Sequence, residues 1–140
     1  MEKVVVNPAE VGQPAGNYSH SVRLTTGDAA LLFISGQVAL GLDGHLVGEG
    51  DVGRQSEQVF ANLEGILAAH GASFADVVRI GTFFVAGIDR EPYLAVRARY
   101  LPDPPPASTT VYVSQLVRPE WLVEVELTAA FPADRVPPSG

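Results

Sequence analysis

Hydrophobic and polar residues follow two different periods along this chain. Six stretches are expected to be strands, at residues 4–6, 19–24, 29–35, 77–85, 109–115 and 121–131. Residues 77–85 are rich in β-branched and aromatic residues, and residues 29–35 are almost continuously apolar. Residues 51–70 instead place apolar side chains on one stripe of a helix. A second helix opens at Asp89 and Pro92 and ends before Pro102. Its expected buried side comprises Leu94, Val96, Ala98 and Leu101.

This element order, β-β-β-α-β-α-β-β, predicts an α+β fold in which a mixed sheet carries both helices on one face. Residues 31–34 are apolar on both alternations. The other face of the sheet should therefore be covered too, and we expect an oligomer. A chain of 140 residues suits one domain. We place that domain at residues 1–131 and a flexible C-terminal tail at residues 132–140.

The composition narrows the classes of function. Cysteine is absent, which excludes disulfides, a thiol nucleophile and thiolate metal ligands. No apolar run approaches the roughly 18 residues of a membrane span, and the first residues do not resemble a signal peptide. We therefore expect a soluble cytoplasmic protein without a membrane partner. The net charge is −7 and the nine Lys and Arg residues are scattered, so we expect no nucleic-acid partner.

The three histidines do not form a metal-binding pattern. His20 lies near a strand start, His45 in a turn and His70 at a helix end, with no spacing that brings several ligands together. We expect no metal, His45 in solvent, and His70 as a favourable charge at the helix C-terminus. The glycine-rich turns also lack the phosphate-binding patterns, and no Gly-x-Ser-x-Gly motif occurs.

Glu124 and Glu126 alternate with apolar residues in the last strand, so both carboxylates point to one face of the sheet. One interpretation is a polar, solvated strand face. If the face instead lines a subunit cleft, burial would raise the pKa of one carboxyl and suit it to acid or base catalysis.

Several segments together resemble the Rid family (reactive intermediate deaminase, YjgF-type), and the resemblance extends from about Ala15 to Phe131. Their order and spacing are more specific than any one of them. They are residues 16–19 (GNYS), 32–37 (LFISGQ), Gln58 with residues 62–63 (NL), 70–78 (HGASFADVV), 96–100 (VRARY), 105–107 (PPA) and 122–126 (LVEVE).

The resemblance implies a chorismate-mutase-like fold, a homotrimer with clefts between adjacent subunits, and hydrolysis of unstable enamines and imines without a cofactor. By the same resemblance, Tyr18 supplies a hydroxyl at the cleft, Ser35 and Gly36 line it, and Glu124 orients or activates water. Proton transfer in both directions suits a hydroxyl and a carboxylate.

The chain departs from the family at the position that clamps the substrate. Family deaminases carry an arginine after Pro-Ala, whereas this chain has Ser108 there. A hydroxyl does not replace a bidentate guanidinium. Arg97 stands where many members have asparagine; it either restores a positive site for an anionic ligand or is a surface arginine. His20, where glutamine is common, either adds a titratable group near Tyr18 or lies on a strand surface.

Two functions remain open from these residues. The first is hydrolysis of a small imine, enamine or related carbonyl compound in an inter-subunit cleft, on a substrate other than the usual 2-imino acid. The alternative is a non-catalytic trimeric module that binds a small metabolite or a protein. Some relatives are labelled endoribonucleases, but a net charge of −7 argues against that activity.

Overall fold

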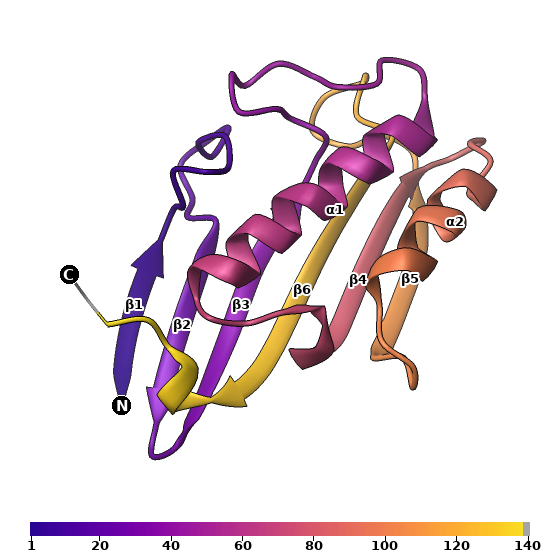
Figure 1. Cartoon of the computed structure of the whole chain (residues 1–140). Helices are drawn as coiled ribbons and strands as arrows, with labels where there is room; N and C mark the ends of the chain where they lie inside the picture. Colours follow the sequence, from indigo (N-terminus) through magenta and orange to yellow (C-terminus); the bar gives the residue numbers. More distant parts are fainter. Residues whose placement is uncertain (139–140) are drawn as a thin grey trace.

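The strand-forming stretches pair into one mixed sheet in the computed structural model, which describes residues 1–138 (Figure 1). The strand order is β1-β2-β3-β6-β4-β5. Neighbouring strands are antiparallel except β4 and β5, which α2 connects in parallel. The strands are β1 (Glu2–Val6), β2 (Ser21–Thr26), β3 (Ala29–Gln37), β4 (Val77–Val85), β5 (Ala107–Val113) and β6 (Val123–Pro132).

Both helices begin and end where local chemistry favours it. The side chain of Asp51 accepts a hydrogen bond from the Arg54 amide (3.0 Å) and so caps α1 (Val52–Ala69). Gly71 follows the C-terminal end with a φ of +79°, a conformation that favours glycine. Pro92 lies in the first turn of α2 (Glu91–Tyr100), where its missing N–H costs nothing.

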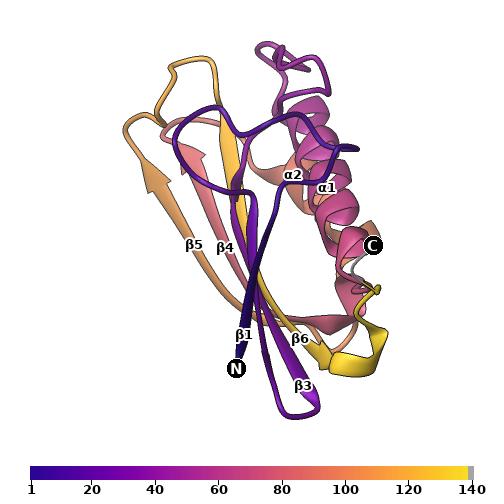
Figure 2. The same cartoon turned by 90° about the vertical axis from the view of Figure 1, so that its left-hand side faces the viewer.

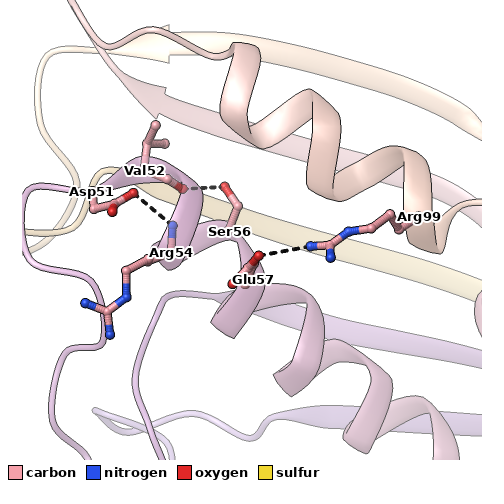
Figure 3. A network of polar contacts seen from close by, with 6 residues as sticks. All are labelled: Asp51, Val52, Arg54, Ser56, Glu57 and Arg99. Atoms are coloured by element: carbon pink, nitrogen blue, oxygen red, sulfur yellow. Dashed lines mark hydrogen bonds and ion pairs between the residues drawn. The ribbon is translucent and has the colours of Figure 1, made fainter.

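The two helices lie side by side on one face of the sheet, and the opposite face carries none (Figure 2). Their exposed sides are linked by an ion pair in which Arg99 of α2 reaches Glu57 of α1 at 3.1 Å (Figure 3). Beneath them, Phe60 packs against Tyr93 and Tyr100, with ring centroids 5.9 and 5.2 Å apart. The core thus lies between the helices and one face of the sheet.

The predicted fold class and element order are confirmed, with strand ends shifted by one or two residues. The predicted buried side of the second helix is only partly right. Val96 is buried, but Ala98 is exposed and Tyr93 is buried in its place. Tyr93 is accommodated in the core because its hydroxyl bonds the Thr82 hydroxyl at 2.7 Å.

The predicted flexible tail is wrong for its first part. Residues 133–135 form a 3₁₀ turn after β6, and Val136 packs against the core. Arg135 holds this turn in place, since its guanidinium reaches Asp76 at 2.6 Å and lies over the ring of Phe131. Residues 139–140 of the predicted tail lie outside the described residues.

The face of the sheet without helices is partly apolar. Phe33 is 45% exposed there, whereas its neighbours Leu32 and Ile34 are buried under the helices. A single chain therefore covers only one of the two apolar faces that residues 31–34 predict. None of the helices formed by residues 1–138 has the length and apolar character needed to cross a membrane.

Candidate functional site

A hollow of about 480 Å³ opens where β3 and β6 meet two loops. One wall is the loop before β2, another is the end of β3, and the third is the loop between β5 and β6. The lining residues are Ala15, Gly16, Tyr18, Ser35, Gly36, Val117, Arg118, Trp121, Glu124 and Glu126. Four of the six predicted site residues therefore meet in one place: Tyr18, Ser35, Gly36 and Glu124.

An irregularity of strand pairing shapes the floor of the hollow. Ile34 pairs with Leu127 and Gln37 with Val125, so Ser35 and Gly36 together lie opposite the single residue Glu126. This is a β-bulge, a feature common beside functional sites. A Cβ at position 36 would collide with the carboxylate of Glu124, so glycine is required for that carboxylate to lie where it does.

The two acidic side chains of β6 lie on the same face, as the alternation predicts. Each lies against a glycine of a neighbouring strand, Glu124 over Gly36 and Glu126 over Gly81. Glu124 is half-buried, and burial raises the pKa of its carboxyl, with a further contribution from the negative charge of Glu126. Glu124 is therefore a stronger base than an ordinary solvated glutamate, and it can accept and return a proton at the hollow.

Hydroxyl groups lie on the loop before β2 and at the end of β3. The Ala15 amide donates to the Tyr18 hydroxyl at 3.2 Å, which orients the phenol. A phenol that accepts one bond still carries a proton to donate. Ser35 donates its own proton to the Ser19 carbonyl (2.6 Å), so this hydroxyl ties the bulge to the loop that carries Tyr18.

His20 lies behind this wall and not on a strand surface, contrary to one of the two interpretations of the sequence. It is 4% exposed, and its Nε2 donates to the Gly12 carbonyl at 2.5 Å. Its amide donates to Asn7 Oδ1 (2.8 Å), and its carbonyl accepts from the Ser35 amide (2.9 Å). His20 therefore fixes the loop before β2 against β3.

Two predicted binding residues lie elsewhere in the chain. Arg97 of α2 lines a separate hollow of about 310 Å³ together with Asp103. Ser108 of the edge strand β5 pairs with Ile80, whose side chain is buried on the helix side of the sheet. Because paired residues share a face, Ser108 belongs to that side as well. Within one chain, Arg97 and Ser108 do not join the hollow that contains Glu124.

The other two histidines, His45 and His70, lie in different surroundings, one exposed and one buried. His45 lies in solvent, as predicted, and pairs with Asp43 at 3.1 Å. The prediction of a charged His70 is wrong, because the side chain is fully buried, with Nε2 2.8 Å from Ser21 Oγ and Nδ1 2.8 Å from Arg23 Nη1. Burial and the charge of Arg23 lower its pKa to about 4, so the ring is neutral. Across residues 1–138 no three His, Asp or Glu side chains gather as a metal site.

Sequence reasoning missed the third wall of the hollow, which contains Arg118 and Trp121. The guanidinium of Arg118 lies 5.8 Å from the centroid of the Trp121 ring, and Trp121 is 6% exposed. The Trp121 amide donates to the Arg118 carbonyl (3.1 Å) across Pro119, which forms a turn. Pro119 indicates a turn in the sequence, but no neighbouring residue indicates that this turn borders a site.

A buried glutamine of α1 anchors that turn. Gln55 is fully buried, and its amide donates to the Glu120 carbonyl at 3.1 Å. The same side chain accepts from the Leu122 amide at 2.9 Å. Because the side-chain amide of Gln55 bonds backbone groups on both sides of Trp121, it ties the loop between β5 and β6 to α1.

The chain is similar to proteins of one family over nearly its whole length. A relative from Myxococcus xanthus named Protein DfrA is 35% identical over 118 residues, 84% of this chain and 88% of that protein. A 2-iminobutanoate/2-iminopropanoate deaminase from Dermatophagoides farinae is 27% identical over 124 residues, 89% of this chain and 93% of that protein. The crystal structure of RidA from an Antarctic Psychrobacter superposes with a TM-score of 0.79 at 26% identity, covering 91% of this chain and 99% of that one.

The family model described as endoribonuclease L-PSP matches residues 9–131, which include β2 to β5, all of β6 except its last residue, and all residues of the hollow. The segments that resemble Rid proteins fall within the same range. The chain is a member of the endoribonuclease L-PSP family, which includes the proteins named Rid and YjgF.

Proposed function

We propose that the protein hydrolyses a small imine or enamine in the hollow beside Glu124. The observation that carries this proposal is the half-buried Glu124 carboxylate, whose pKa is raised and which lines the same hollow of about 480 Å³ as Tyr18. A relative that bears the name 2-iminobutanoate/2-iminopropanoate deaminase supports the reaction class. No step of the reaction needs a cofactor.

The reaction moves a proton from oxygen to nitrogen in each of two stages, and Glu124 can carry the proton in both. The carboxylate accepts a proton from water as the water oxygen bonds to the imine carbon, and the C=N π electrons move to nitrogen. Glu124 then returns the proton to nitrogen, which gives a carbinolamine. It next accepts the proton of the carbinolamine hydroxyl and passes it to nitrogen as the C–N bond breaks, so that a carbonyl compound and ammonia leave. An enamine must first take a proton on carbon to become the imine. Tyr18 donates a hydrogen bond to the nitrogen or the developing carbonyl oxygen.

We further propose that the working form is a homotrimer whose clefts lie between neighbouring chains. The partly apolar sheet face around Phe33 supports association, since a second copy would bury it. The same arrangement would let the edge strand β5 of one copy approach the hollow of the next. Arg97 and Ser108 would enter the site only in this way.

Ser108 favours a second candidate function, a module that binds a small metabolite without converting it. The side chain at this position carries no charge, so it supplies no anion clamp to a neighbouring copy. Cleavage of RNA, which the family's description names, is the less favoured activity. A chain with a net charge of −7 and scattered basic residues offers little attraction for a phosphate backbone.

The test follows ammonia release from imines generated in situ by two flavin oxidases. An amino-acid oxidase supplies 2-imino acids and an amine oxidase supplies imines without a carboxylate. We expect the wild-type protein to accelerate ammonia release from at least one of them above the buffer rate. Acceleration only by Ser108→Arg would identify the wild-type protein as a binding module. No acceleration by either protein would contradict imine hydrolysis altogether.

A further inference from the structure

One guanidinium and two carboxylates share the hollow. Arg118 is the basic residue among its lining side chains, and Glu124 and Glu126 are the acidic ones. Among residues 1–138, no Asp or Glu oxygen lies within ion-pair distance of the Arg118 guanidinium; the pairs present are His45–Asp43, Arg99–Glu57 and Arg135–Asp76. A guanidinium with no carboxylate of its own chain as partner is free to bind an anionic group.

The loop that carries Arg118 is organised before any ligand binds. The Trp121 amide closes the turn on the Arg118 carbonyl, and Gln55 anchors the two residues on either side of Trp121. The buried Trp121 ring supports the guanidinium from below. A cation held on a buried aromatic ring loses less conformational entropy on binding than a free surface arginine.

Arg118 also has open space on two sides. A second hollow of about 470 Å³ shares Ala15, Arg118 and Trp121 with the first. The guanidinium therefore lies at the boundary between the two, where a ligand in the first hollow can reach it and a substituent can extend into the second.

We propose that Arg118 binds the carboxylate of the ligand whose C=N group lies at Glu124. This inference rests on the proposed function for the C=N group, and it adds a specificity-determining residue at a position separate from Ser108. The hollow then suits a molecule that carries an anionic carboxylate at one end and a protonated C=N nitrogen at the other. The guanidinium faces the first charge, and the two carboxylates of β6 face the second. Arg118 thus determines specificity, and it takes no part in proton transfer.

Binding of stable carbonyl compounds tests this inference apart from catalysis. The probes are 2-oxobutanoate, which carries a carboxylate, and butanone, which has a similar skeleton and no charge. Their dissociation constants are measured by NMR titration for the wild-type protein, Arg118→Ala and Arg118→Lys. Arg54→Ala is the matched control, because Arg54 is an exposed arginine of α1 outside the hollow and its removal changes the net charge equally.

We expect Arg118→Ala to weaken binding of 2-oxobutanoate at least about tenfold. The affinity of Arg118→Lys should lie between those of the wild-type protein and Arg118→Ala, because lysine keeps the charge but cannot form the two parallel hydrogen bonds of a guanidinium. Binding of butanone should stay within about twofold in all variants, as should binding of 2-oxobutanoate to Arg54→Ala. The inference is wrong if Arg118→Ala binds 2-oxobutanoate as the wild-type protein does, if it weakens both probes equally, or if the wild-type protein does not bind 2-oxobutanoate.

The oxidase assay separates this inference from the proposed function. Hydrolysis of imines with an unchanged preference for 2-imino acids in Arg118→Ala would retain the function and overturn the role of Arg118. Loss of 2-oxobutanoate binding in Arg118→Ala, without hydrolysis by the wild-type protein, would retain the role of Arg118 and overturn the function.

Discussion

The carboxylate of Glu124 lies directly over Gly36, in the space that any larger residue at position 36 would fill with a Cβ. The β-bulge at Ser35 and Gly36 and the alternation of β6 together create this contact. Glu124 is half-buried in this position, and burial raises the pKa of its carboxyl, with a further contribution from the charge of Glu126. The glycine at position 36 therefore leaves the space in which the Glu124 carboxylate lies.

Replacement of Gly36 by alanine should displace the Glu124 carboxylate and lower the hydrolysis rate at least about tenfold, since small displacements of catalytic groups are costly. The matched control is Gly81→Ala, where the new Cβ would meet Glu126 Oε1 at 2.8 Å. Both proteins should keep the far-ultraviolet circular dichroism of the wild-type protein. Equal losses of activity in the two variants would contradict a special role for the contact with Glu124.

Glu124→Gln should make the folded protein more stable at pH 7. The pKa of Glu124 is higher in the folded protein than in the unfolded chain. The protonated carboxyl therefore stabilises the fold at a pH below the unfolded pKa, and this stabilisation is lost as the pH rises through the folded pKa. The ionised carboxylate therefore destabilises the fold at neutral pH, and the amide relieves this effect. Thermal unfolding at pH 7 should give a higher Tm for the variant, with the difference disappearing near pH 4. A lower Tm at pH 7 would contradict the raised pKa.

His70 should make the protein sensitive to acid. Its pKa is about 4 in the folded protein, against an ordinary value of 6.5 for histidine. The unfolded state therefore binds more protons between these values, and stability falls as the pH drops from about 6.5 to about 4. The difference corresponds to at most about 3 kcal/mol. Urea unfolding across this range should show a shallower pH dependence in His70→Gln, and an unchanged slope would contradict the neutral buried ring.

Gln55→Leu should cost about 2–4 kcal/mol of stability, because the Leu122 amide and the Glu120 carbonyl lose their partner in a buried setting. The turn that carries Arg118 would also lose its anchor. Urea unfolding measures the first effect. The second should appear as weaker binding of 2-oxobutanoate while Arg118 is still present. Unchanged stability would show that the loop between β5 and β6 does not depend on Gln55.

The fold could be predicted well from the sequence because helix and strand periods are local signals. Glu124 and Glu126 were placed on one face for the same reason, since alternation in a strand fixes the side. What the sequence did not reveal depends on contacts between distant segments. His70 follows a helix and looked solvated, yet Ser21 and Arg23 of β2 enclose it. Arg118 lies in a loop, and only Gln55, more than 60 residues earlier, indicates where that loop is held.

The central claim is that Glu124 transfers the proton during hydrolysis, and a comparison of initial rates tests it most directly. Ammonia release from an imine generated in situ is measured for the wild-type protein and for Glu124→Gln at equal concentrations, from pH 5 to pH 8. The wild-type rate should rise through the raised pKa of Glu124 and exceed the buffer rate, while Glu124→Gln should fall at least about 100-fold at the plateau. A Glu124→Gln protein that hydrolyses the imine at the wild-type rate would contradict the account.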